Sequence, residues 1–439
     1  MKKCIVIMLS LCVFMTACAN GGSESKEQTS DEKKTITVSV MDPNRFLETA
    51  ARKFEETHPH IRIEIKESMG LESGNNTEGD TQDMNKFIQT VTTEALSGNV
   101  SDIIAMDLLP LDVFVQKNIL VNLYDLMAQE SSFDKKQYFE KIMEASQTGD
   151  GLYAMPISFS TSAMLGKPDL LTEASISIDD KAWTWDDFTN ITRKVNEQSS
   201  EDYYGMLNFL PAQLLLDYIE NNYSELVQQD QRTANFDSDT FRNKMNQVKS
   251  MYDNEILGSG GMEEVDKVLF SILQIYDPGT AVTTILQPNT QLFQQPTENG
   301  IFRGGSFKTA STFGINSNSK VQQEAWEFIQ FLLSEEMQSS PELMGLPLHS
   351  GVMDKKLEAV KQQIQAGKLQ LPDGADPDLL DERIPQLKRI LEEAGITSHA
   401  DSKILRIAME EIQAFMSGQK PAEEVSKLIQ NRVMTYLNE

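Results

Sequence analysis

The sequence is poor in the residues that carry covalent and metal chemistry. Its 439 residues include 3 cysteines, 4 histidines and 3 tryptophans. Cys4 and Cys12 lie in an N-terminal apolar segment that Cys18 closes, so the chain beyond residue 18 can form no disulfide within itself and holds no further thiol. His58 and His60 are the only neighbouring histidines, and no His-Glu-x-x-His pattern occurs. Neither a phosphate loop nor a Gly-x-Ser-x-Gly motif is present. We therefore expect no metal, no cofactor and no enzymatic activity.

Positive charge is also scarce. The chain has 39 Lys and Arg against 66 Asp and Glu, a formal net charge of −27 at pH 7. A surface this acidic repels phosphate backbones and anionic lipid headgroups. We therefore expect no nucleic-acid partner and no electrostatic docking on a membrane. The charge is suited to keeping the protein soluble outside the cell.

Long apolar runs are missing except at the N-terminus. Residues 5–17 are mainly apolar, but the run is shorter than the ~20 residues that a membrane-spanning helix needs. It follows two lysines and ends on small residues before Cys18, which resembles the lipobox of bacterial lipoproteins, with Met15 where leucine is usual. The resemblance implies a signal peptide at 1–17 and a diacylglycerol and palmitate anchor on Cys18. The protein would then be a lipoprotein on the extracytoplasmic face of the cell membrane.

The first folded part of the chain shows strand and helix patterns in turn. Residues 35–40 and 61–65 alternate and are β-branched, which predicts strands. Between them, apolar residues recur at helical spacing over 46–54. A further helix at 83–97 precedes a buried strand at 102–106. This strand-helix-strand order favours parallel strands and an α/β fold.

The later part of the chain continues in the same way. Thr184 and Asp187 have the spacing of a capping box, which predicts a helix start at residue 184. The pattern also predicts a strand at 151–157 and helices at 325–333, 403–416 and 422–437.

Several landmarks, taken in order, resemble the extracellular solute-binding proteins of ABC importers, the family of the maltose-binding protein. They are residues 46–65, 101–123, 152–157, 183–188, 314–328 and 417–424. The resemblance implies a two-lobed periplasmic-binding-protein type fold, with doubly wound sheets joined by hinge crossings. It also implies a ligand held between the lobes, closure about the hinge and docking on ABC transporter permease subunits.

The predicted division of the chain follows from these landmarks. It comprises a signal peptide at 1–17, a flexible polar tether at 18–34, an N-terminal lobe at 35–155 and 278–325, and a C-terminal lobe at 156–277 and 326–439.

Two acidic residues follow predicted strands, where ligands of open α/β sheets bind. Asp42 ends the first strand, and Asp107 ends the strand at 102–106. A carboxylate can accept hydrogen bonds from sugar hydroxyls. Each residue also has a structural explanation, because Asp42 can form the turn before Pro43 and Asp107 can cap the next helix.

Aromatic faces are the second requirement for holding a sugar ring. Phe159 follows the crossing strand, Phe209 lies in a loop, and Tyr276 lies in a region that lines the cleft in the family. Trp183 is expected to be more exposed than Trp185, which would pack on the helix start. Gly305 could bring its backbone close to a ligand. Phe159 and Phe209 are also compatible with the core, where phenylalanine more often lies, and Gly305 with a plain turn.

These observations lead to one main hypothesis. The chain is expected to be a monomeric, lipid-anchored binding protein that delivers a small solute, a sugar or oligosaccharide, to an ABC importer. Two alternatives share the same export signal: a surface enzyme that acts on polysaccharide, and a ligand-sensing lipoprotein. The loop at 286–290 lacks the tryptophans of well-known oligosaccharide binders, so the identity of the ligand is left open.

Overall fold

The computed structural model describes residues 33–42, 44–67, 77–130, 133–207, 210–229, 231–397 and 400–438. Cys18, the predicted signal peptide and most of the tether lie outside these ranges, as does Phe209. Within them, no helix is long and apolar enough to cross a bilayer.

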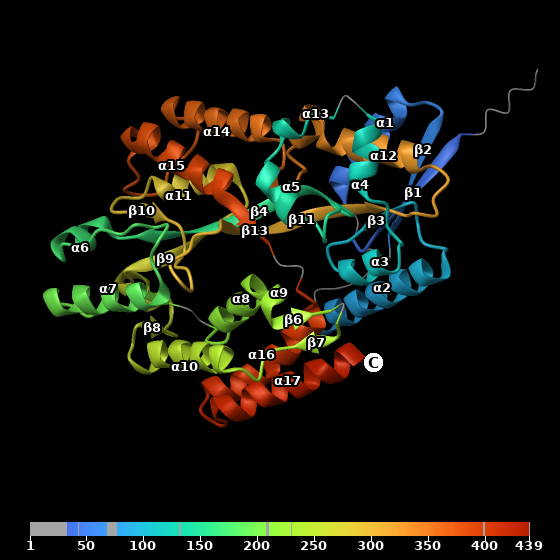
Figure 1. Ribbon diagram of the computed structural model, residues 1–439. Coiled ribbons are helices and arrows are strands. Elements are labelled where there is room, and N and C mark those ends of the chain that lie inside the picture. Colours follow the sequence, from blue (N-terminus) through green and yellow to red (C-terminus); the bar gives the residue numbers. More distant parts are fainter. Residues whose placement is uncertain are drawn as a thin grey trace, which may run out of the picture.

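Strands and helices alternate along the chain (Figure 1). The strands are β1 (Lys34–Val40), β2 (Ile61–Glu67), β3 (Ile103–Ala105), β4 (Met155–Gly166), β5 (Met206–Leu207), β6 (Val227–Gln228), β7 (Thr233–Ala234), β8 (Leu257–Gly258), β9 (Phe270–Ile275), β10 (Gln291–Phe293), β11 (Gly305–Ile315), β12 (Leu346–Pro347) and β13 (Ala394–Ile396). The α-helices are α1 (Arg45–Thr57), α2 (Thr77–Ser97), α3 (Leu111–Gln116), α4 (Leu123–Gln129), α5 (Glu140–Ala145), α6 (Pro168–Glu173), α7 (Trp185–Gln198), α8 (Gln213–Asn221), α9 (Tyr223–Leu226), α10 (Asp239–Asp253), α11 (Pro278–Ile285), α12 (Gln322–Leu333), α13 (Glu335–Gln338), α14 (Ser350–Gln365), α15 (Leu380–Glu393), α16 (Ser402–Met416) and α17 (Ala422–Asn438). Short 3₁₀ helices lie at Lys135–Gln137, Met262–Lys267 and Pro377–Leu379.

The N-terminal lobe begins with the predicted strand-helix-strand unit. β1 pairs in parallel with β2 and, on its other side, with β3. Ile36 and Val38 point into the core, as the alternation predicts. α1 begins after Asn44, whose side chain accepts a hydrogen bond from the Leu47 N–H, and it buries an apolar face that includes Phe54. The predicted α/β character is confirmed.

Two long strands connect the lobes across the middle of the molecule (Figure 1). β4 and β11 are antiparallel, with Phe313 opposite Met155 and Phe307 opposite Thr161. At one end β11 pairs with β3 of the N-terminal lobe, and at the other end β4 pairs with β9 and β10 of the C-terminal lobe. The two lobes therefore share one curled sheet, with order β10-β4-β11-β3-β1-β2 along its main path.

This topology leads us to propose other lobe boundaries than those predicted from the sequence. Residues 278–304 were assigned to the N-terminal lobe, but α11 packs with β9, α14 and α15, and β10 pairs with the C-terminal half of β4. Residues 326–333 of α12 were assigned to the C-terminal lobe, but Phe328 and Phe331 contact Phe54 of α1 in the N-terminal lobe. The second crossing is β11, which pairs with β13 at Gly305 and with β3 of the N-terminal lobe from Phe313, so the return to the N-terminal lobe lies near residue 313 and not near residue 278.

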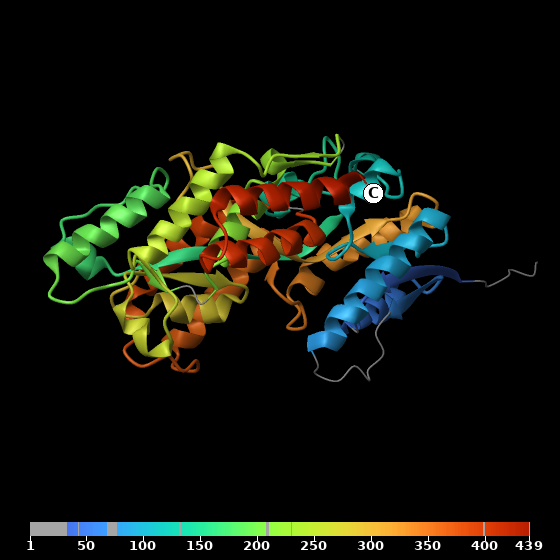
Figure 2. The ribbon, with the colours of Figure 1, turned by 90° about the horizontal axis from the view of Figure 1, so that it is seen from below.

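Helices of the C-terminal lobe pack around a second core. α7, α8 and α10 contribute apolar faces to it, and α16 and α17 close it from one side. α16 and α17 lie side by side across the face seen in Figure 2. They match the predicted helices at 403–416 and 422–437 to within one residue at either end.

The predicted capping box at the start of α7 is confirmed. The Thr184 hydroxyl accepts from the Asp187 N–H at 3.1 Å, and the Asp187 carboxylate accepts from the Thr184 N–H at 2.8 Å. We expect Thr184→Ala to lower the free energy of unfolding by about 1 kcal/mol, because the Asp187 N–H loses its hydroxyl acceptor, while the N–H of residue 184 keeps the Asp187 carboxylate. Thr184→Ser keeps the oxygen and should stay close to the wild type in urea denaturation. Equal stability of the alanine and serine variants would contradict this role.

Candidate functional site

Two cavities of similar size adjoin the crossing strand β11. The first, which we call the interlobe cavity, has a volume of about 600 Å³ and lies between the residues after β3 in the N-terminal lobe and α8 and the start of α16 in the C-terminal lobe. The second, which we call the C-lobe cavity, has a volume of about 640 Å³ and lies between α7, α8, α10 and residues 294–306. Asn221 and Ser306 belong to the walls of both. Each volume falls in the range of small-molecule sites, roughly 300–1,000 Å³.

Asp107 lies on the N-terminal wall of the interlobe cavity. Its Oδ2 accepts a hydrogen bond from the Thr312 N–H of β11 at 3.3 Å. Although Asp107 as a residue is exposed, protein atoms surround its carboxylate. This desolvation raises the pKa of Asp107, and the hydrogen bonds from Thr312 oppose the rise. A carboxylate has about four acceptor positions, so Asp107 can still accept a hydrogen bond from a ligand.

Asp217 on α8 lines the C-lobe cavity, as Asp107 lines the interlobe cavity. Gln213, one turn earlier, donates to its Oδ1 at 2.8 Å. Burial raises the pKa of Asp217, and the hydrogen bond from Gln213 opposes the rise. A partly desolvated carboxylate with one neutral donor gains from a second donor, so Asp217 is suited to bind a hydroxyl or an N–H of a ligand.

Lys244 on α10 lines the C-lobe cavity, with only 5% of the residue exposed. Its Nζ lies 2.9 Å from Glu298 Oε1 and 3.1 Å from Gln247 Oε1, and 5.4 Å from the ring centroids of Trp185 and Tyr218. Desolvation lowers the pKa of Lys244, and Glu298 opposes this. An ammonium has three N–H donors, so one remains for a ligand beside two aromatic rings.

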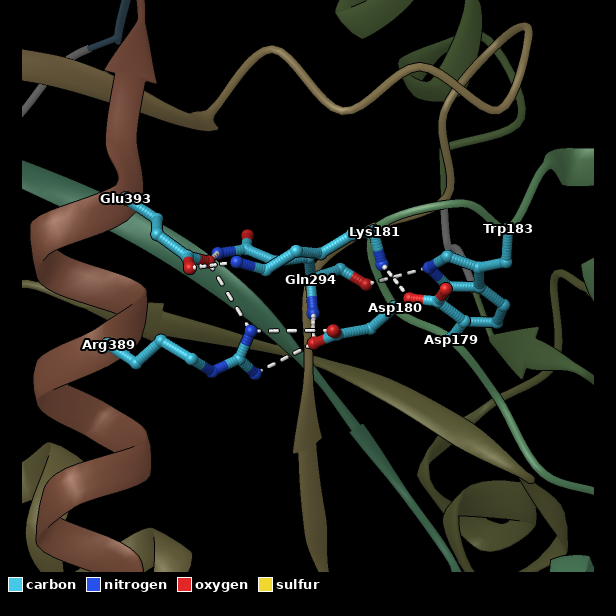
Figure 3. A network of polar contacts seen from close by, with 7 residues as sticks. All are labelled: Asp179, Asp180, Lys181, Trp183, Gln294, Arg389 and Glu393. Carbon is cyan, nitrogen blue, oxygen red and sulfur yellow. Dashed lines mark hydrogen bonds and ion pairs between the residues drawn. The ribbon is translucent and has the colours of Figure 1, made fainter.

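A polar network holds Gln294, at the start of the segment 294–306 that lines this cavity (Figure 3). Gln294 is 1% exposed: its N–H donates to Asp180 Oδ2 at 2.9 Å, its side chain donates to Glu393 Oε2 at 2.9 Å, and its carbonyl accepts from Trp183 Nε1 at 3.1 Å. Arg389 on α15 joins the two carboxylates, with contacts of 2.7 Å to Asp180 and 3.3 Å to Glu393. The network fixes residue 294 between α15 and the loop before α7.

The charges of this network stabilise one another. Desolvation would raise the pKa of Glu393, but Lys181, Gln294 and Arg389 outweigh it, and the pKa of Glu393 is lowered. Asp180 and Glu393 are nearly buried, with 15% and 13% of their side chains exposed. Ionised carboxylates in such surroundings need their cationic partners.

We expect Arg389→Met to lower the free energy of unfolding by about 1–2 kcal/mol, because both carboxylates lose a cation while Arg389 itself is only partly buried. Lys181→Met is the matched control: Lys181 is half exposed, and its removal should cost less than about 1 kcal/mol. Urea denaturation of both variants measures the difference. A larger loss for Lys181→Met than for Arg389→Met would show that Arg389 does not hold the network together.

The structure brings two of the predicted site residues to the cavities. Asp107 lines the interlobe cavity, and Gly305 lines the C-lobe cavity at the start of β11. A Cβ on Gly305 would lie 3.2 Å from Gln294 Oε1, so the small residue allows this close approach. Asp42 is exposed at the end of β1, outside the walls of both cavities.

The predicted aromatic residues within the described ranges lie elsewhere. Phe159 is fully buried, with ring contacts to Phe139 and Phe307, so it belongs to the core. Trp183 is 4% exposed, and its indole is part of the network in Figure 3. Trp185 lines the C-lobe cavity and is 6% exposed, so, contrary to the prediction, Trp183 is not the more exposed of the two tryptophans. Tyr276 is exposed but lines neither cavity.

Sequence reasoning missed Asp217 and Lys244. Gln213, Asp217 and Asn221 recur every four residues, which marks one polar face on α8. Lys244 lies among Phe241, Met245, Val248 and Met251 on the buried face of α10. A lysine on an apolar helix face is the signal that could have identified it, because a buried lysine needs a partner. In the part of the chain that the structure describes, no group of three or more His, Cys, Asp or Glu residues could hold a metal ion.

Comparison with known proteins places the chain in a family. A family model described as bacterial extracellular solute-binding protein matches residues 40–339, and the chain belongs to this family. The match covers both crossing strands, β4 and β11. The family is one of binding proteins that act outside the cell.

Solved structures share the fold. The sugar-binding protein MalE of Xanthomonas citri is similar with a TM-score of 0.63 at 15% identity, covering 92% of this chain and 98% of that one. A periplasmic oligogalacturonide-binding protein of Yersinia enterocolitica gives 0.59 at 18% identity, covering 92% and 99%. A cyclic α-maltosyl-1,6-maltose binding protein of Arthrobacter globiformis gives 0.59 at 13%, covering 92% and 99%. The two-lobed periplasmic-binding-protein fold is thereby shown.

Proposed function

We propose that this protein is a lipid-anchored receptor that captures an uncharged oligosaccharide in the two joined cavities and delivers it to an ABC importer. The observation that carries the proposal is the lining of the C-lobe cavity. It combines carboxylate and amide acceptors on α8 and α10 with the rings of Trp185 and Tyr218. Hydroxyl-rich sugars need this combination, because their edges are polar and their ring faces are apolar.

The charges of the C-lobe cavity favour an uncharged ligand over an acidic one. Its two cations already face carboxylates: Lys244 pairs with Glu298, and Arg303 lies 3.6 Å from Glu225. Asp186 and Asp217 add further negative charge to the walls. A ligand carboxylate would compete with these groups for the same cations, which disfavours its binding.

Export, anchoring and delivery form the rest of the proposal. The N-terminal pattern up to Cys18 supports lipid attachment, and membership of the family supports transfer to permease subunits. Replacing Cys18→Ser should release the protein from the cell membrane into the medium, as fractionation would show. An unchanged membrane fraction would exclude the lipid anchor.

A thermal-shift panel tests the ligand class. The mature chain, residues 18–439, is mixed with neutral malto-oligosaccharides, acidic oligogalacturonides and amino-bearing chitosan oligosaccharides. A ligand at 100 times its Kd adds about 2.7 kcal/mol to the free energy of unfolding. We expect such stabilisation from a neutral saccharide. Stabilisation by the acidic series alone would refute the uncharged class, and no shift with any member would refute the saccharide receptor.

A further inference from the structure

The two cavities meet at a row of polar contacts between α8 and the start of β11. We call this row the α8–β11 bridge, and it consists of Glu220, Asn221 and Glu225 on the α8 side with Arg303, Ser306 and Lys308 on the β11 side. Lys308 Nζ lies 3.0 Å from Glu220 Oε2, the Ser306 hydroxyl donates to Asn221 Oδ1 at 3.1 Å, and Arg303 lies 3.6 Å from Glu225 Oε1.

The order of these contacts follows the cleft from one cavity to the other. The Arg303–Glu225 pair lies on the C-lobe cavity, and the Lys308–Glu220 pair lies on the interlobe cavity. The Asn221–Ser306 contact stands between them, and both of its residues line both cavities. A ligand that occupies the two cavities at once must therefore pass through the position of this contact.

The strand side of the bridge is fixed. The Ser306 carbonyl accepts from the Thr161 hydroxyl at 2.7 Å, and Ser306 pairs with Ile396 in the ladder between β11 and β13. The bridge itself is weak, because exposed ion pairs of this kind contribute about 0–1 kcal/mol each and a neutral hydrogen bond about 1 kcal/mol. Lys308 and Arg303 have 68% and 65% of their side chains exposed. Such contacts can break and re-form as a ligand enters.

We infer that the α8–β11 bridge sets the length of ligand that the cleft accepts, with Asn221 and Ser306 as the specificity-determining pair. A short saccharide fills one cavity and leaves the bridge closed. A longer one gains contacts in both cavities but must first open the Asn221–Ser306 contact. The inference rests on the proposed saccharide binding and adds to it a selection by length.

An engineered, reducible disulfide between positions 221 and 306, which we call the lock, tests the selection by length. In the mature chain with Cys18→Ser, the pair Asn221→Cys and Ser306→Cys supplies the only two thiols, and a loss of free thiols reports disulfide formation. Maltose and maltohexaose serve as the short and long probes in calorimetric titrations before and after reduction. We expect the reduced protein to bind both probes. The oxidised protein should keep its affinity for maltose within about twofold and lose at least about tenfold for maltohexaose.

A second variant does not depend on the disulfide. Ser306→Ala removes the donor of the bridge, so one hydrogen bond no longer has to be broken, and the ratio of the maltohexaose affinity to the maltose affinity should rise about fivefold. Ser311→Ala, on the same strand and outside the walls of both cavities, is the matched control. Equal responses of the two probes, in the lock or in Ser306→Ala, would overturn the inference and leave the receptor function standing. If the wild type binds neither probe nor any other saccharide, both the selection by length and the proposed saccharide-receptor function are refuted.

Discussion

Replacing Glu298→Ala is expected to lower the free energy of unfolding by about 2–3 kcal/mol. Lys244 is held in the protein with 4% of its side chain exposed, and Glu298 is its anionic partner at 2.9 Å. Removing one member of a buried pair costs about 3–5 kcal/mol, because the other charge stays desolvated and unpaired. The expected loss is smaller here, because Glu298 keeps 35% of its side chain exposed and Gln247 still accepts from Lys244.

A double-mutant cycle separates the pair from its surroundings. Lys244→Met keeps much of the volume between Trp185 and Tyr218 and removes the charge, so it should be less destabilising than Glu298→Ala. The double variant should be more stable than the sum of the two single losses predicts. Guanidinium denaturation of the three variants measures this coupling. Additive losses would show that Lys244 and Glu298 do not interact in the folded protein.

Replacing Asp217→Ala is expected to weaken binding of the neutral saccharide about 10- to 100-fold. A hydrogen bond to a charged group contributes about 1.5–3 kcal/mol, and the alanine leaves the ligand donor without an acceptor. Asp217→Asn keeps one oxygen and should lose less. Calorimetric titration measures both affinities. Asp186→Ala serves as the control, because the carboxylate of Asp186 in the same cavity already accepts a hydrogen bond from Gln247.

Ligand affinity should decline at acid pH, and this acid limb of the pH profile should report the protonation of Asp217. Burial raises its pKa above the ordinary value of 3.8. Protonation removes an acceptor, so affinity should fall as the pH falls through this raised pKa, at a higher pH than an ordinary aspartate would give. Asp217→Asn should shift this limb or remove it. A pH profile identical in the wild type and in Asp217→Asn would exclude Asp217 as a ligand contact.

Much of the fold could be predicted because its signals are local. The capping box at Thr184 involves neighbours in sequence, and the alternation in β1 and β2 reports burial directly. The lobe boundaries could not be read in this way, since the pairing of β11 with β3 and the packing of α12 on α1 join residues far apart in the chain. Strand and helix patterns do not reveal which lobe an element joins.

The candidate site was harder to predict for a related reason. The position of Asp107 on a cavity wall could be predicted, because ligands of open α/β sheets bind at the carboxyl ends of the strands. Which tryptophan reaches the cavity depends on the environment of each ring: Trp183 points to Gln294 and the core, whereas Trp185 packs beside Lys244. Phe159 was expected near a ligand because it follows a crossing, but a central strand buries both of its faces.

Calorimetric titration of residues 18–439 with neutral, acidic and amino-bearing linear oligosaccharides tests whether the protein is a receptor for uncharged saccharides. We expect saturable binding of a neutral oligosaccharide that Asp217→Ala weakens and that Asp186→Ala largely preserves. Tighter binding of an oligogalacturonide than of every neutral member, or an absence of binding across the panel, would contradict it.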